Sequence, residues 1–142
     1  MGQIQAVIEQ VGPSTSRATV RTHTVSVDRP TAKGGADRGP MGGEYLLVAL
    51  GGCFMSNLLA AARAREAALS NARVTVTGTL AGTPERFTTF TLNISATCSD
   101  SAMLPKLVTV AERGCIVSNT LKEVGPISIV LEESSAGQAM NA

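Results

Sequence analysis

The sequence predicts an α+β fold in which one long central helix packs against antiparallel β-sheets. Three observations support this prediction. Strand patterns lie before and after the helix, apolar helix formers run together from Tyr45 to Ala62, and Phe87–Cys98 alternates apolar with polar residues. The chain has 142 residues, of which 44% are hydrophobic and 16% are charged. Residues 1–142 are therefore expected to form a single domain with a substantial core.

The first third of the chain is predicted to contain strands followed by a loop. Ile4–Glu9 is short and rich in β-formers, and Ala18–Val27 alternates with a period of two, with a hairpin turn expected near His23. Asp28–Gly43 is rich in glycine and proline and is expected to lack regular structure.

The clearest helix is predicted over Glu44–Ala68. It is apolar around most of its circumference up to Ala62, which is typical of a helix buried at the centre of a fold. Within it, Gly51 and Gly52 each cost about 1 kcal/mol relative to alanine. Such a cost is expected where another backbone approaches closely, or where the helix breaks and leaves a new N-terminus beside Cys53.

The second half of the chain is predicted to hold two strands, a second helix and a last strand. The two strands are Arg73–Leu80 and Phe87–Cys98, the second with one buried and one solvated face, as in an antiparallel sheet. Met103–Glu123 is the second helix, Ile127–Leu131 is the last strand, and residues 132–142 are expected to form a loose tail.

Composition excludes several classes of function. The net charge is +1 without a basic stripe, and only 3% of residues are aromatic, so no nucleic-acid partner is expected. Glycine and polar residues interrupt the apolar run from Tyr45 to Ala62, so no membrane span is expected either. The N-terminus shows no secretory signal, and three cysteines do not form a disulfide framework. We therefore expect a cytoplasmic protein with reduced thiols.

The three cysteines are the candidates for chemistry. Cys98 ends the apolar face of a strand and is interpreted as a packing residue. Cys53 and Cys115 lie in the two predicted helices, and they are either small buried hydrophobes or a catalytic or redox-sensing pair. Zinc is not expected, because His23 is the one histidine and no two cysteines have ligand spacing.

The contexts of Cys53 and Cys115 resemble the osmotically inducible protein C and organic hydroperoxide resistance (OsmC/Ohr) family. That family carries a Gly-Pro-rich loop, a Glu-Leu-Leu-type helix start, a small-small-Cys step and a later Cys-x-Val-Ser-x-x-Leu element. The chain reads GPMGGEYLLVALGGCFM from Gly39 and AERGCIVSNTL from Ala111. The resemblance spans about Val25 to Leu131 and keeps the order of the predicted elements.

The resemblance implies an OsmC-like fold and a thiol peroxidase that uses no metal or bound cofactor. Carried over by position, Cys53 corresponds to the peroxidatic cysteine and Cys115 to the resolving cysteine. The implied partners are an organic hydroperoxide as substrate, an external dithiol reductant (a lipoyl protein or a small thiol), and a second copy of the chain in an intertwined homodimer.

The family also uses an arginine, positioned by a glutamate, to hold the thiolate and orient the peroxide. Glu44 fits the glutamate of the helix start, and Arg38 in the Gly-rich loop is the first choice for the arginine, with Arg17 or Arg29 as alternatives. The chain has Ile116 where well-characterised members have proline after the second cysteine, and it lacks their Asn-Pro-Glu start. These departures indicate a divergent or generic branch.

Two other functions remain open from the sequence. The chain could be a non-catalytic dimer that binds a small hydrophobic ligand, or a redox sensor whose disulfide switches partner binding. The apolar neighbours of Cys53 along the helix are interpreted mainly as core residues, although some would line an apolar substrate pocket: Tyr45, Phe54, Met55 and Leu58.

Overall fold

The computed structural model describes residues 2–132. The chain forms two compact units, with the boundary between Leu46 and Leu47. The first unit holds a small sheet and a loop, and the second holds the larger sheet and most of the helices. The predicted tail at 132–142 falls, apart from Glu132, outside the described residues.

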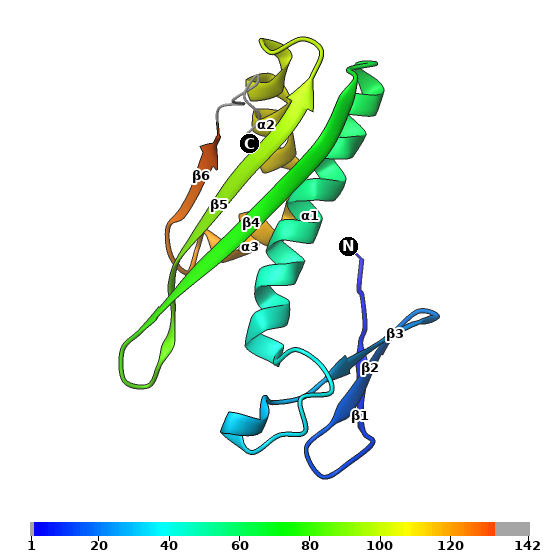
Figure 1. Ribbon diagram of the computed structural model, residues 1–142, viewed down its shortest axis with the longest axis vertical. Coiled ribbons are helices and arrows are strands. Elements are labelled where there is room, and N and C mark those ends of the chain that lie inside the picture. The colour runs from blue at the N-terminus through cyan, green and yellow to red at the C-terminus, as the bar shows by residue number, and fades with distance from the viewer. Residues whose placement is uncertain (1, 133–142) are drawn as a thin grey trace. The chain divides into compact units, whose positions relative to one another are not determined.

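The first unit contains a three-stranded antiparallel sheet in the order β1-β2-β3 (Figure 1). Its strands are β1 (Val7–Gln10), β2 (Ser16–Val20) and β3 (His23–Val27). The pairing of Val20 with His23 confirms the hairpin predicted near His23, and Arg21 in the turn adopts a positive φ of 56°.

The loop after β3 is organised by one buried carboxylate, that of Asp28. Apart from a short 3-10 helix, η1 (Thr31–Lys33), the loop has no regular structure, as predicted. Asp28 accepts hydrogen bonds from the Thr15 hydroxyl at 2.7 Å and from the backbone N–H groups of Arg29 at 2.7 Å and Arg38 at 3.2 Å. Burial opposes ionisation, but these hydrogen bonds outweigh it and hold the pKa of the Asp28 carboxyl well below its usual range. The loop therefore closes around a fixed negative charge.

The second unit is built on a sheet in the order β4-β5-β6. β4 (Leu69–Ala81) and β5 (Arg86–Cys98) pair antiparallel, whereas β6 (Ile127–Leu131) pairs parallel to β5. The prediction of purely antiparallel sheets is wrong for this last pair. The physical reason is that β5 and β6 are joined by a helical crossover, and such a connection returns the chain in the same direction.

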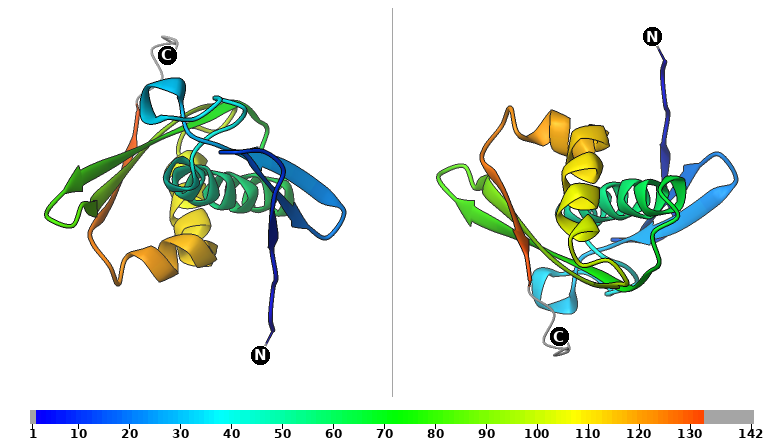
Figure 2. Two further views of the ribbon diagram at one scale, coloured as in Figure 1. Left: turned by 90° about the horizontal axis from the view of Figure 1, so that it is seen from below. Right: turned by 90° about the horizontal axis from the view of Figure 1, so that it is seen from above.

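Helices cover one face of this sheet, as the two views in Figure 2 show. They are α1 (Gly42–Ala64), which begins in the first unit, α2 (Met103–Gly114) and α3 (Ile116–Leu121). The largest fully buried side chains come from α1, β5, α2 and the α2–α3 junction, and they are Leu50, Phe54, Leu58, Phe90, Leu92, Ile94, Leu107 and Cys115. Each large apolar side chain in this core contributes about 1.5–3 kcal/mol through burial.

The central helix differs from the prediction in extent and in burial. α1 runs from Gly42 to Ala64, and Glu66 takes a left-handed φ of 52° where the chain turns toward β4. Only one face of α1 is covered within the described chain, since Val48 is 59% and Leu59 is 42% exposed. The expectation of burial around most of the circumference is therefore wrong for the single chain.

α1 is long and apolar enough to cross a membrane by length and composition alone. The core helices of soluble proteins meet the same criteria.

Candidate functional site

Cys53 lies in the middle of α1, where the helix continues without interruption. Of the two alternatives that the sequence leaves open for Gly51 and Gly52, the break in the helix is therefore wrong. Gly51 instead allows close packing, because a Cβ there would lie 2.7 Å from Cγ2 of Val76 on β4, whereas a Cβ on Gly52 would meet open space. The glycine brings α1 against the sheet two residues before the half-buried thiol of Cys53.

Cys115 lies at a break between two helices, not inside one helix as predicted. Its backbone is extended, with φ −80° and ψ 106°, between the end of α2 at Gly114 and the start of α3 at Ile116. The physical reason is a helix cap. The Cys115 sulfur accepts a hydrogen bond from the Ser118 N–H at 3.4 Å, which satisfies one of the free amides of the first turn of α3. This bond fixes the sulfur in the core, where Cys115 is fully buried.

The structure brings Cys53 and Cys115 together. Both are free thiols, and the two side chains lie near enough to each other for Cys53 to affect the ionisation of the Cys115 thiol. Burial raises the pKa of the Cys115 thiol, and the neighbouring Cys53 sulfur raises it further, while the Ser118 N–H opposes part of the shift. At neutral pH Cys115 is therefore protonated, and the pair consists of one half-buried and one fully buried thiol.

Asn57 also belongs to this site, although the sequence analysis did not select it. It lies one helical turn after Cys53, and its Nδ2 donates to the Cys53 carbonyl oxygen at 2.8 Å and reaches the Cys53 sulfur at 3.8 Å. A polar residue at position +4 from a cysteine, within an otherwise apolar helix, was the signal that could have identified it.

The remaining predicted site residues belong to the first unit, whereas both thiols belong to the second. Glu44 is exposed in the first turn of α1, where its carboxylate accepts the Met41 N–H at 2.8 Å. Arg38 has an exposed side chain, while its backbone N–H is bound by Asp28. Arg17 on β2 and Arg29 in the loop are also exposed.

The apolar residues near Cys53 along the helix, which the sequence analysis interprets mainly as core residues, differ in their burial. Phe54 and Leu58 are fully buried in the core and Met55 is half-buried, so the core interpretation holds for the first two. Tyr45, in the first unit, donates its hydroxyl hydrogen to the Ser26 carbonyl oxygen at 2.6 Å.

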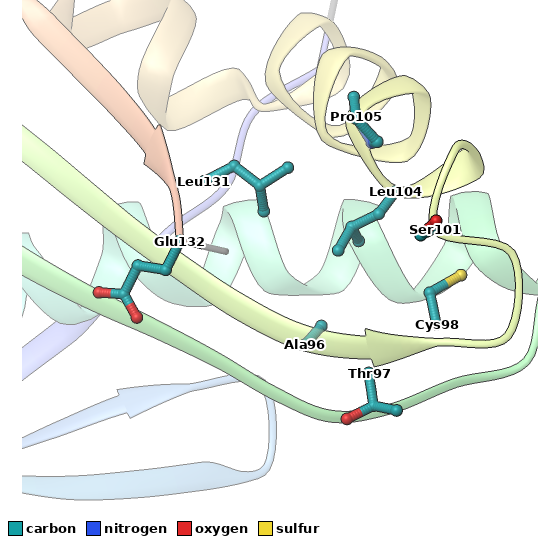
Figure 3. A pocket seen from close by; sticks show the side chains of 8 residues that line it. All are labelled: Ala96, Thr97, Cys98, Ser101, Leu104, Pro105, Leu131 and Glu132. Atoms are coloured by element: carbon teal, nitrogen blue, oxygen red, sulfur yellow. The ribbon is translucent and has the colours of Figure 1, made fainter. Parts of the chain in front are cut away.

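Cys98 lines a separate groove of about 630 Å³ at the end of β5. Figure 3 shows its sulfur directed toward the turn that carries Ser101, with Leu104 and Leu131 facing each other across the groove. Cys98 is half-buried. Within residues 2–132, no group of three or more His, Cys, Asp and Glu side chains is arranged to hold a metal ion.

Comparisons with known proteins identify the fold. A search of the curated proteins gave no match. Among solved structures, an OsmC-like protein from Mycoplasma pneumoniae is similar with a TM-score of 0.80 at 16% identity, and the match covers 92% of this chain and 96% of that one. An organic hydroperoxide resistance protein OsmC from Legionella pneumophila has a TM-score of 0.69 at 18% identity, covering 94% and 100% of the two chains. The organic hydroperoxide resistance protein OhrB of Bacillus subtilis has a TM-score of 0.63 at 15% identity, covering 90% and 98%.

These likenesses show the α+β fold, with its long helix and two sheets. The two structures named for organic hydroperoxide resistance have the lower TM-scores of the three. The family described as OsmC-like protein matches residues 34–130, which is more than half of the chain and includes both thiols of the pair. The chain belongs to the OsmC-like protein family.

Proposed function

We propose that this protein is a thiol-dependent peroxidase that reduces organic hydroperoxides to alcohols, with Cys53 reacting first and Cys115 second. The observation that carries the proposal is that two free thiols, one from α1 and one from the α2–α3 junction, lie near each other, with Cys53 half-buried and Cys115 fully buried. Structural cysteines do not need a partner sulfur, whereas a two-cysteine peroxidase does.

The reaction proceeds in two steps within the protein. The Cys53 thiolate attacks the terminal oxygen of the hydroperoxide and the O–O bond breaks, which leaves a sulfenic acid on Cys53 and releases the alkoxide as the alcohol after it takes up a proton. The Cys115 sulfur then attacks the Cys53 sulfur and displaces hydroxide, which takes the thiol proton of Cys115 and leaves as water. The product is a Cys53–Cys115 disulfide.

The different burial of the two sulfurs sets the order of these steps. A hydroperoxide reaches the half-buried Cys53 more readily than Cys115, which has no exposed surface. The raised pKa of Cys115 also keeps that thiol protonated and unreactive until the neighbouring sulfenic acid forms.

An external dithiol completes the cycle, because reduction of the disulfide to two thiols needs two electrons and two protons. A lipoyl protein or a small thiol in the cytoplasm would supply them.

We further propose that Arg38 and Glu44 support the Cys53 thiolate, as the family resemblance implies, and that the working form is a homodimer. The exposed apolar face of α1 favours the dimer, since such a face is typical of a subunit contact.

The test is to treat the fully reduced protein with one equivalent of cumene hydroperoxide, map the disulfides by mass spectrometry and measure peroxide consumption under excess dithiol. We expect a Cys53–Cys115 link and repeated turnover. Cys53→Ser should abolish turnover, Cys115→Ser should accumulate over-oxidised Cys53, and the matched control Cys98→Ser should keep parent activity. Full activity in Cys53→Ser would refute the proposal. A link formed without turnover would instead identify a redox sensor, and no reaction at any thiol would leave a ligand-binding dimer.

A further inference from the structure

Asn57 is placed to act on the sulfur that the proposed reaction uses first. It is half-buried on α1, four positions after Cys53 and on the same side of the helix. A side-chain amide carries two N–H donors. One is used by the Cys53 carbonyl oxygen, with Nδ2 at 2.8 Å.

The Asn57 amide nitrogen also reaches the Cys53 sulfur, with Nδ2 3.8 Å from Sγ, and its second N–H is available to donate to that sulfur. This distance suits an N–H···S contact, which is longer than an N–H···O bond because sulfur is the larger atom. The carbonyl bond also settles which end of the amide lies here, because the amide oxygen would repel the carbonyl oxygen of Cys53. The sulfur therefore faces a donor whose orientation a stronger bond holds.

Gly114 leaves the space that the Asn57 amide occupies. A Cβ at position 114 would lie 2.9 Å from the Asn57 amide oxygen, so any side chain there would displace the amide. Gly114 immediately precedes Cys115, and it is the last residue of α2. The Asn57 amide thus lies between the two chain segments that carry the thiol pair, with its nitrogen toward Cys53 and its oxygen toward Gly114.

A simpler interpretation is that Asn57 only bonds back to the carbonyl four residues earlier, as polar residues within helices often do. Thr109 does this on α2, where its hydroxyl donates to the Pro105 carbonyl oxygen at 3.1 Å. Asn57 differs from Thr109 in two ways: its amide nitrogen has a second N–H and lies 3.8 Å from a sulfur, and a glycine on the facing segment leaves room for the amide.

We infer that Asn57 is a catalytic residue, whose side-chain N–H donates to the Cys53 sulfur, stabilises the negative charge of the thiolate and holds the sulfur toward Cys115. The role of Asn57 in a catalytic cycle rests on the proposed function. Its expected effect on the reactivity of the Cys53 sulfur does not depend on that function and can be measured separately. A hydrogen bond to the sulfur favours the reactive thiolate over the unreactive thiol, and this gain exceeds the accompanying loss of intrinsic nucleophilicity. Removing such a bond is expected to slow the reaction about tenfold.

The experiment uses full-length protein in a Cys98→Ser, Cys115→Ser background, in which Cys53 is the one remaining thiol. Two rates are measured at a fixed pH near neutrality, alkylation of Cys53 by iodoacetamide and sulfenic acid formation with cumene hydroperoxide. Asn57→Leu keeps the size of the side chain and removes both donors. Asn57→Asp places an acceptor and a negative charge beside the sulfur. Thr109→Val is the matched control, because it removes a bond to a carbonyl four residues earlier without touching a thiol.

We expect Asn57→Leu to slow both rates about tenfold, Asn57→Asp to slow them further, and Thr109→Val to leave them unchanged. A purely structural role would lower the melting temperature without producing this order of rates. Should Asn57→Leu fail to fold, Gly114→Ala tests the same point, since it displaces the amide from the other side and should also slow Cys53.

Two results separate the inference from the function on which it rests. If both rates in Asn57→Leu and Asn57→Asp stay within twofold of the parent while the parent consumes peroxide, the assignment of Asn57 is overturned and the peroxidase proposal stands. If Cys53 of the parent forms no sulfenic acid but its alkylation slows in the Asn57 variants, the peroxidase proposal fails, whereas the donor to the sulfur is confirmed.

Discussion

Gly51 and Gly52 provide a matched test of how α1 packs on the sheet. Replacing either glycine with alanine removes the same intrinsic cost of glycine in a helix, about 1 kcal/mol. The surroundings differ, because a Cβ on Gly51 would lie 2.7 Å from Val76 Cγ2, whereas a Cβ on Gly52 would have no atom within 4 Å. Overpacking a filled core costs about 1–3 kcal/mol. For the monomeric chain, we therefore expect Gly52→Ala to raise the free energy of unfolding by about 1 kcal/mol, and Gly51→Ala to lie about 1–3 kcal/mol below Gly52→Ala.

The assay is urea unfolding followed by far-ultraviolet circular dichroism, in reducing buffer and at a protein concentration low enough for the chain to be monomeric. Each alanine variant is also made in a Val76→Ala background, which removes the methyl group that a Cβ on Gly51 would contact. The difference between the two variants should shrink to less than half in that background, because the steric cost is then relieved. The reasoning is refuted if Gly51→Ala is as stable as Gly52→Ala, or if Val76→Ala leaves their difference unchanged.

Three further predictions concern charge and assembly. Asp28→Asn should lower the stability of the first unit above about pH 4. The pKa of Asp28 is lower in the folded protein than in the unfolded chain, so its ionised carboxylate stabilises the fold above its ordinary pKa. This stability is lost as the pH falls toward the pKa of Asp28 in the folded protein. The free energies of unfolding of the parent and the variant should converge as the pH is lowered, and a difference that grows at low pH would contradict the assignment. Cys115→Ala should reduce the loss of stability above about pH 8.5, because a raised pKa of Cys115 gives stability that is lost as the pH rises through that pKa. If the melting temperature falls with alkaline pH as steeply in the variant as in the parent, this prediction is wrong. Val48→Lys on the exposed face of α1 should shift a dimer toward monomer in sedimentation velocity, whereas Thr75→Lys on β4 should not, and a parent that is monomeric at every concentration would exclude the proposed homodimer.

The second sheet shows which parts of the fold can be predicted from a pattern. The face shared by Phe90, Leu92 and Ile94 is buried as predicted, because a period of two allows only one set of alternate residues to face the core. The parallel direction of β6 was also encoded, since a strand, a helix and a strand in sequence normally form a parallel crossover. The extent of α1 was less predictable. Residues 65–68 are mostly good helix formers, yet the chain turns at Glu66 to begin β4.

The thiol site shows where a linear pattern is insufficient. The positions of Cys53 and Cys115 follow from the family motifs, but their surroundings depend on atoms from distant segments. Gly114 was the available sign that the second helix stops before Cys115, because glycine is common at helix ends. Nothing in the sequence indicates that the sulfur itself caps the next helix, since that bond depends on the conformation of the junction. The buried carboxylate of Asp28 was hidden for the same reason, inside a segment read only as a loop.

The helix cap at Cys115 also bears on how a buried thiol takes part in the second proposed step. Burial makes the Cys115 thiolate costly, but an attacking sulfur must carry some negative charge as the S–S bond forms. The Ser118 N–H, which already bonds to this sulfur at 3.4 Å, favours that charge and offsets part of the cost of burial. The sulfur can therefore remain protonated and protected while Cys53 reacts, and still form the bond once the sulfenic acid is beside it. The formation of the disulfide is then driven by the departure of hydroxide as water, and Cys115 does not have to lose its proton before it attacks the sulfenic acid.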